Sequence, residues 1–410
     1  MPELFQVVTI AQANERLINH VLPIKRVERV PLLDALDRVI AQDLYAPVDL
    51  PAFARSTMDG FAVRAADTYG ASEGLPAYLT VAGEVPMGQT ATVNVGAGMA
   101  VRIHTGGMLP PNGDAVVMVE HTQMVDQRLI EVVRPVAVGE NVIPVGEDIR
   151  TGALLFGHGH RLRPQDLGGL AGVGITTVPV VARPQVAILA TGDEIIPAEQ
   201  EPGPGQVRDI NTYTIAALSQ RAGALPVPLG IAPDDAEVLR QQASAALATA
   251  DVLIISAGSS VSTRDMTAQV INELGQPGVL IHGVSIHPGK PTILAVADGK
   301  PVFGLPGNPV STIIAFGLFV IPALLRLLGC RPSPIHNQVQ ARLTHNVASY
   351  PGREDFVPVR LITRDGALWA EPLFGKSNLI YTIAHADGIL HVPLDRAGLY
   401  VEDLVTVRLF

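Results

Sequence analysis

Cysteine, lysine and excess positive charge are all scarce in this chain of 410 residues. Cys330 is the only cysteine, so an intrachain disulfide is excluded, and we expect a reducing, cytoplasmic environment. The formal net charge is −10, so we do not expect the basic stripe with which a protein binds a nucleic-acid backbone. A pocket in an acidic protein can still be locally positive, so small anions are not excluded as ligands.

From the sequence we expect neither a signal peptide nor a segment that crosses a membrane. The start of the chain, MPELFQVVTIAQANERL, lacks the basic residues and the uninterrupted apolar stretch of a signal peptide. The most apolar run is VSTIIAFGLFVIPALLRLLG (310–329), which contains Ser311, Thr312 and Pro322 and loses its apolar character at Arg326. It falls short of the ~20 apolar residues that a membrane span needs, so we expect a buried helix and no membrane partner.

The chain does contain an alternation of apolar strands and helices between residues 186 and 328. The expected strands include 186–190, 227–231, 251–260 and one that begins at 301. The expected helices are 211–223, with Asn211 as N-cap, 234–250 and 264–275. This pattern indicates a parallel, doubly wound α/β sheet that is covered on both faces. Ligands bind outside the carboxyl ends of such strands, so TGDE (191–194), SAGSS (256–260) and GLPGNP (304–309) are expected along one rim.

The two flanks of this region have other patterns. Residues 46–142 carry short β-like runs divided by Gly and Pro, which predicts a β-rich unit. Residues 8–20 and 31–44 have helical periodicity. The runs from about 331 to 410 predict a small β-barrel or sandwich.

Two stretches on the expected rim could bind anions or a metal. In LPGNPVS (305–311), Asn308 is a good N-cap, Pro309 fits the first helical position and Gly307 permits a tight turn. Such a helix start presents free N–H groups to an anion, although an ordinary strand-to-helix turn has the same signature. Glu194 follows a buried strand in TGDE and could hold Mg²⁺, or it could simply face water. Asp265 is a second candidate for Mg²⁺, with an N-cap role as the alternative.

The lysines are informative because there are only four: Lys25, Lys290, Lys300 and Lys376. Lys290 lies in HPGKP (287–291), where two prolines fix the backbone and a glycine permits close approach to a ligand. Lys376 lies in a similar loop, FGKSN. Arg353 in PGRED (351–355) has a guanidinium fork that suits an oxyanion. A solvent-facing turn is the alternative for each of these cations, as a cap or turn is for Asp59 in STMDGFAVR.

These motifs occur in one order along the chain: STMDGFAVR, RIHTGG, VGEDI, ATGDEI, SAGSSVSTRDMT, HPGKP, GLPGNPVS and PGRED. Together they closely resemble the molybdopterin molybdenumtransferase family, the enzymes related to the E domain of gephyrin. The resemblance implies an elongated homodimer of four-domain chains. It assigns 1–45 together with 143–182 to one domain that begins with a helical segment, 46–142 to a β-rich insert, 183–330 to a molybdopterin-binding α/β domain and 331–410 to a β-barrel.

The resemblance also implies the reaction. Molybdate and adenylylated molybdopterin are the substrates, AMP leaves, and molybdenum is inserted in molybdenum cofactor biosynthesis. The polar positions that match those tied to activity are Asp59, Thr105, Asp148, Glu194, Asp234 and Asp265. Mg²⁺ is the implied cofactor, with Asp265 as its first expected ligand and Glu194 as its second. The positions that match substrate-binding ones are Lys290, Pro291, Pro306, Gly307, Asn308, Pro309, Ser311, Arg353 and Ser377.

One departure from the family pattern concerns the cations around HPGKP. Some relatives have lysines where this chain has His287 and Gly283, so anion affinity is expected to be lower or to depend partly on the protonation of His287. The choice between molybdate and tungstate stays open. Two other functions stay open as well. One is the activity of a molybdopterin adenylyltransferase, a protein that is also a candidate partner, and the other is a non-catalytic dimeric scaffold that binds a peptide.

Overall fold

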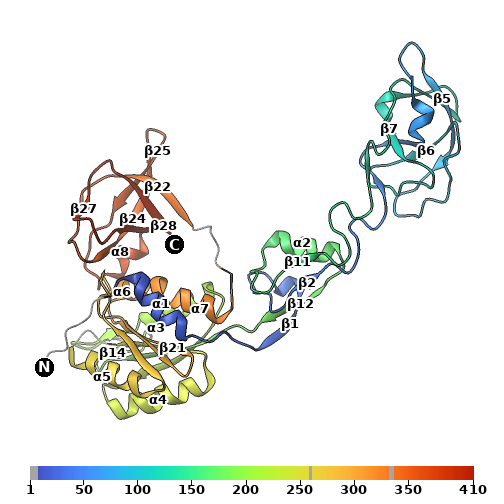
Figure 1. Cartoon of the computed structure of the whole chain (residues 1–410). Coiled ribbons are helices and arrows are strands. Elements are labelled where there is room, and N and C mark those ends of the chain that lie inside the picture. Colours follow the sequence, from blue (N-terminus) through green and yellow to red (C-terminus); the bar gives the residue numbers. More distant parts are fainter. Residues whose placement is uncertain (1–7, 258–260, 332–336) are drawn as a thin grey trace.

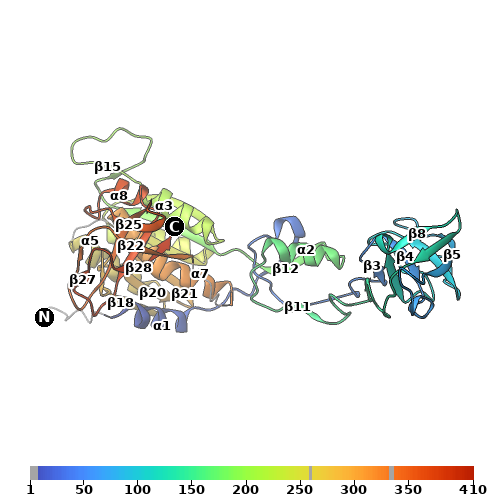
Figure 2. The ribbon, with the colours of Figure 1, turned by 90° about the horizontal axis from the view of Figure 1, so that it is seen from above.

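The computed structural model describes residues 8–257, 261–331 and 337–410, without the side chains of 261–264. The chain is elongated (Figures 1 and 2). A β-rich unit lies at one end, a small mixed unit lies in the middle, and the α/β region with the C-terminal barrel lies at the other end. In both views the middle unit separates the β-rich unit from the α/β region.

The α/β region is built on a six-stranded sheet. Its strands, in spatial order, are β16 (Leu225–Ala232), β13 (Gln185–Thr191), β17 (Val252–Ala257), β21 (Lys300–Pro306), β20 (Ile293–Ala297) and β18 (Pro277–His282). The first four are parallel, which confirms the predicted doubly wound core. β20 and β18 are antiparallel to their neighbours. The sequence pattern did not distinguish β20 from a parallel strand, because β20 is buried on both faces. The sign of an antiparallel hairpin is Asp298-Gly299 before β21, where both residues have a positive φ.

Helices cover both faces of this sheet. On one face lie α1 (Ile10–His20), α3 (Asn211–Arg221), α6 (Pro309–Ala315), the π-helical turn η4 (Phe316–Val320) and α7 (Ile321–Leu327). On the other lie α4 (Ala236–Thr249) and α5 (Val261–Glu273). The helices predicted within the α/β region, at 211–223, 234–250 and 264–275, are therefore confirmed. Asn211 is not a cap, however, because Ile210 occupies that position and Asn211 is already helical.

The apolar run after residue 308 forms one long helix from Pro309 to Leu327. Its length and mean hydropathy of 2.1 would allow it to cross a membrane, so the prediction that the segment falls short of a span was wrong. Of its most apolar 18-residue window, 61% is buried inside the fold, and Phe316 and Phe319 are completely enclosed. Such burial is typical of the core helix of a folded domain.

The middle unit pairs the two ends of the β-rich insertion. Its pairs are β1 (Val27–Pro31) with β12 (Thr177–Val181) and β2 (Leu44–Tyr45) with β11 (Leu154–Phe156), and α2 (Pro164–Gly172) packs beside them. The helix expected over 31–44 is wrong: only the 3₁₀ turn η1 (Leu32–Asp34) forms there. Asp37 has a positive φ, and Val39 and Ile40 bridge to Arg161 and Val180, so β pairing with distant residues overrides the local helical periodicity.

The β-rich unit is a six-stranded sheet around a core that includes Phe61, Leu79 and Ile130. Its strands in order are β7 (Ala115–Met118), β4 (Gly60–Val63), β6 (Met99–Ile103), β5 (Ala77–Glu84), β9 (Leu129–Val132) and β8 (Thr122–Met124). The 3₁₀ helices η2 (Ala65–Thr68) and η3 (Val119–His121) adjoin it, and β3 (Arg55–Ser56) pairs with β10 (Val142–Ile143) where the chain enters and leaves.

The C-terminal region is a closed five-stranded barrel, as predicted. Its strands are β22 (Gln338–Leu343), β24 (Glu354–Arg364), β25 (Ala367–Pro372), β26 (Gly388–Val392) and β28 (Leu404–Leu409). β24 pairs with both β25 and β26 and thereby closes the ring. The short pairs β23 (Val347–Ala348) with β27 (Gly398–Leu399) and β14 (Ile195–Ile196) with β15 (Val207–Arg208), and the helix α8 (Ile380–Ala384), complete the fold.

Candidate functional site

The carboxyl ends of β13, β17 and β21 lie side by side. Ala190 is opposite Ser256 in one parallel pair, and Ala257 is opposite Pro306 in the next. TGDE and GLPGNP therefore emerge on one rim with the end of β17 between them, as expected from the strand pattern. Residues 258–260 of SAGSS lie outside the described residues.

Asn211 ties this rim together. Its Nδ2 donates hydrogen bonds to Ser256 Oγ at 2.9 Å and to the carbonyl oxygen of Gly307 at 2.8 Å. The side chain is buried, so it fixes the GLPGNP turn against the end of β17. Sequence reasoning assigned Asn211 only a capping role because its two partners are distant in the chain.

The TGDE turn is held by two aspartates, Asp193 of the turn itself and Asp234 of the segment between β16 and α4. Thr191 Oγ1 donates to Asp234 Oδ1 at 2.9 Å, and the Asp234 N–H donates to Asp193 Oδ1 at 3.1 Å. Gly192 has a φ of 146°, a conformation that favours glycine, and a Cβ there would lie 2.8 Å from Oε2 of the half-buried Glu194 and would displace that carboxylate. Asp193 and Asp234 thus stabilise the loop that positions Glu194.

Asp265 lies within α5 rather than before it. The helix begins at Val261, so the N-cap alternative is excluded, and the Asp265 side chain is exposed. Across the three described ranges, no three or more His, Cys, Asp and Glu side chains are grouped to hold a metal ion. A magnesium ion at Glu194 and Asp265 would therefore need ligands from the substrate as well as from the protein.

HPGKP and PGRED, which are far apart in sequence, are joined by strand pairing. β19 (Ile286–His287) runs parallel to the start of β24, so that His287 is opposite Asp355. Asp355 is 3% exposed, and its Oδ1 lies 3.0 Å from Arg353 Nε and 3.3 Å from His287 Nδ1. Ser349 Oγ donates to its other oxygen. Burial, followed by the charge of Arg353, lowers the pKa of His287, while Asp355 opposes this shift.

These groups face a cavity of about 670 Å³ between the α/β region and the barrel, which we term the interdomain cavity. Its polar lining includes His287, Asn308, Arg353, Lys376 and Ser377. Asn308 Nδ2 donates to Ser377 Oγ at 2.9 Å, and the Val310 N–H donates to the carbonyl oxygen of Ser377 at 3.1 Å. The start of α6 is therefore tied to the barrel loop, with two cationic side chains beside it.

The remaining predicted binding residues are close in the chain to lining residues of this cavity but are not part of its lining. Lys290 is exposed, and a Cβ on the neighbouring Gly289 would lie 3.6 Å from the carbonyl oxygen of Ser311, so the HPGKP turn packs against α6. Ser311 and Pro306 are buried. The described lining of the cavity does not include Lys290, Pro291, Pro306, Gly307, Pro309 or Ser311.

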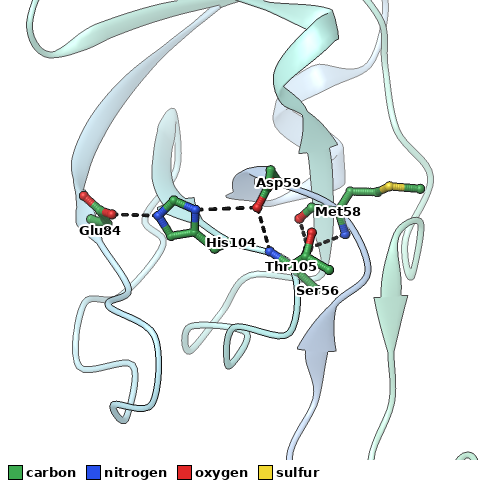
Figure 3. A network of polar contacts seen from close by, with 6 residues as sticks. All are labelled: Ser56, Met58, Asp59, Glu84, His104 and Thr105. Carbon is green, nitrogen blue, oxygen red and sulfur yellow. Dashed lines mark hydrogen bonds and ion pairs between the residues drawn. The ribbon is translucent and has the colours of Figure 1, made fainter.

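Asp59 and Thr105 converge in the β-rich unit (Figure 3). The Thr105 N–H donates to Asp59 Oδ1 at 2.8 Å, and this bond is the main cause of a lowered pKa of Asp59. Asp148 is exposed where the β-rich unit meets the middle unit, and its N–H donates to the carbonyl oxygen of Leu50 at 3.0 Å. Asp59 precedes β4 and Thr105 follows β6, so both belong to the β-rich unit. Within one chain the middle unit separates this unit from the α/β region and the barrel (Figures 1 and 2).

Three family models match almost the whole chain. They are the MoeA N-terminal region (domain I and II) at residues 8–174, a probable molybdopterin binding domain at 187–326, and the MoeA C-terminal region (domain IV) at 340–410. A molybdopterin molybdenumtransferase of Bacillus subtilis is 34% identical over 370 residues, covering 89% of this chain and 86% of that protein. The chain belongs to the molybdopterin molybdenumtransferase family.

Two further proteins are similar to this chain over most or all of their length. A molybdopterin molybdenumtransferase of Nostoc sp. is 35% identical over 372 residues, which cover 90% of this chain and 85% of that protein. The crystal structure of a molybdopterin biosynthesis moeA protein from Pyrococcus horikoshii superposes with a TM-score of 0.87 at 31% identity, over 99% of this chain and 100% of that one. The matches on both sides of the α/β domain also argue against an adenylyltransferase, because that activity would explain a match to the α/β domain only.

Proposed function

We propose that this chain inserts molybdenum into adenylylated molybdopterin, with molybdate as the metal source and AMP as the second product. The interdomain cavity is the observation that carries this proposal. It gathers Arg353, Lys376, Ser377 and Asn308 at one place in a protein that is otherwise acidic and poor in lysine. A guanidinium, an ammonium, a hydroxyl and an amide are hydrogen-bond donors suited to a tetrahedral oxyanion.

The cations have a clear physical task in this reaction. Molybdate, the dithiolene sulfurs and the pyrophosphate of the substrate are all negatively charged, so their approach is opposed by Coulomb repulsion. Arg353, Lys376 and the nearby Lys290 offset this repulsion in a cavity that excludes part of the water. His287 is the adaptable member of the set, because an oxyanion beside it favours its protonated form.

Magnesium is part of the proposal, with Asp265 and Glu194 as the protein ligands. The two carboxylates are suitable donors, since Mg²⁺ prefers oxygen and is commonly held by one or two carboxylates together with waters and substrate phosphates. The ion would neutralise charge on the pyrophosphate oxygens. In this arrangement Asp234 and Asp193 keep the TGDE turn in shape, which holds Glu194 at the rim.

We further propose that the working form is a homodimer in which each site combines two chains. Asp59 and Thr105 belong to the β-rich unit, which the middle unit separates from the two parts of the chain that form the interdomain cavity, yet their positions match those tied to activity in this family. A symmetric pair of elongated chains can place the β-rich unit of one copy at the interdomain cavity of the other. This arrangement would bring both sets of polar residues to one substrate.

The test is an insertion assay with purified protein, adenylylated molybdopterin, Mg²⁺ and either molybdate or tungstate. The proposal predicts AMP release together with metal-loaded pterin, both dependent on the oxyanion, and the two oxyanion arms reveal the metal preference. Product formation from ATP and unmodified molybdopterin would instead indicate an adenylyltransferase. If the folded, dimeric protein forms no product from any of these substrates, the alternative of a non-catalytic scaffold would be favoured.

A further inference from the structure

In the β-rich unit, His104 lies between two carboxylates, those of Asp59 and Glu84 (Figure 3). His104 follows β6, and its Nδ1 lies 3.5 Å from Asp59 Oδ1. On the other side of the ring, Nε2 lies 2.9 Å from Oε1 of Glu84, the last residue of β5. Three separate segments of the unit therefore meet at one imidazole.

The surroundings show that the carboxylate of Asp59 is oriented but still accessible. Its Oδ1 receives the Thr105 N–H and faces His104, whereas the side chain as a whole is 63% exposed. Ser56 holds the preceding turn, since its hydroxyl donates to the carbonyl oxygen of Met58 at 2.6 Å and accepts from the Met58 N–H at 3.2 Å. One oxygen is thus held from within the unit while the group remains open to a molecule arriving from outside.

A purely structural purpose explains this cluster poorly. His104 and Glu84 are 37% and 51% exposed, and ion pairs between such exposed groups contribute little to the stability of a fold. A neutral imidazole can donate to only one of its two carboxylate neighbours, whereas the protonated ring can donate to both. The arrangement is better suited to orienting Asp59 than to stabilising the sheet.

We propose that His104 is a positioning residue, which holds the carboxylate of Asp59 in the orientation needed at the dimeric site and is itself held by Glu84. The proposal rests on the proposed function, because it assigns Asp59 to that site. His104 does not touch the substrate in this account. It acts through Asp59 alone.

The test compares substitutions of His104 in the full-length protein by the insertion assay. Asparagine places an amide donor near the Nδ1 position, toward Asp59, whereas glutamine places one near Nε2, toward Glu84. We expect H104A and H104Q to lower kcat about tenfold, the effect typical of removing a residue that orients an active group, with little change in KM. H104N should retain most of the activity.

Controls separate positioning from folding. His121, the other histidine of this unit, contacts Arg134 at its edge, so H121A should leave kcat unchanged. In a D59A background, adding H104A should cause no further loss, because a residue that acts through Asp59 has no effect once Asp59 is removed. The melting temperature of each His104 variant should stay close to that of the wild type. An NMR titration of ¹³C-labelled aspartate should show a raised pKa of Asp59 in H104A.

The outcomes distinguish this proposal from the proposed function. If the wild-type protein inserts molybdenum and H104A does so at the same rate, the positioning role is wrong and the function stands. Equal losses in H104A and H104N, or losses that add to that of D59A, would also overturn it. If the wild-type protein does not insert the metal at all, the proposed function fails and the role of His104 fails with it.

Discussion

The guanidinium of Arg353 is held at the interdomain cavity by Asp355, whose Oδ1 lies 3.0 Å from Arg353 Nε. The Arg353 side chain also lies over the ring of Tyr350, with 4.8 Å between the guanidinium carbon and the ring centre. Asp355 is almost completely buried, so it acts as a fixed anchor rather than as a competitor for the arginine at the surface. A carboxylate in the proposed anion-binding region thus serves to orient the cation.

This relationship predicts the effect of D355N. The substitution keeps the shape of the side chain but removes the charge that fixes Arg353, so we expect the KM for molybdate to rise about tenfold with a smaller effect on the KM for the pterin. The measurement is the molybdate dependence of insertion. E354Q is the matched control, because the neighbouring Glu354 binds His391 instead of Arg353. Equal effects of the two substitutions would contradict the anchoring role.

His287 predicts a dependence of molybdate affinity on pH. Burial and the charge of Arg353 lower its pKa below the usual 6.5, so the ring is neutral at pH 7 in the free protein. A bound dianion favours the protonated ring, and affinity should therefore strengthen as the pH falls from 7 toward 5. Direct binding of molybdate at several pH values checks this. The dependence should be largely lost in both H287Q and H287K, with tighter binding by H287K at pH 7.

Asp166 predicts an acid-sensitive middle unit. Burial alone would raise its pKa, but hydrogen bonds from the side chains of Arg163 and His160 and from the Arg163 N–H outweigh burial and lower the pKa to about 2. Because this value is below the model-peptide value of 3.8, the ionised group stabilises the fold above pH 3.8, and the contribution is lost as the pH falls toward 2.

The substitution D166N tests this contribution. We expect it to lower the free energy of opening of α2 by about 2 kcal/mol at pH 7, as measured by native-state hydrogen exchange, and the difference should shrink near pH 2. A difference that stays constant over this pH range would show that the charge of Asp166 does not contribute.

Much of the rim could be predicted from the sequence because its determinants are local. Apolar strands followed by helices imply parallel pairing, and parallel pairing places the ends of β13, β17 and β21 together. The helix expected over 31–44 was wrong for the opposite reason. Val39 and Ile40 are used by β bridges to residues more than a hundred positions away, which local periodicity does not reveal.

The contacts that build the site depend on long-range pairing and were not predictable. HPGKP and PGRED each suggested a cation, but the position of Asp355 between His287 and Arg353 follows from the register of β19 on β24. The bridge from Asn211 to Gly307 depends likewise on where α3 begins relative to the sheet. Residue types indicated the chemistry, and tertiary pairing determined which of them meet.

The most direct test of the central claim is complementation between two defective chains. D59A damages the β-rich unit and R353A damages the interdomain cavity, so each homodimer should retain only a small, measurable fraction of the wild-type activity. When the two chains are co-expressed and pair at random, half of the dimers combine both variants, and each of these has one intact composite site. About a quarter of all sites are then intact, and molybdenum insertion should recover to about a quarter of the wild-type activity. If the mixture is no more active than the two variants measured apart, the site does not combine the β-rich unit of one chain with the cavity of another.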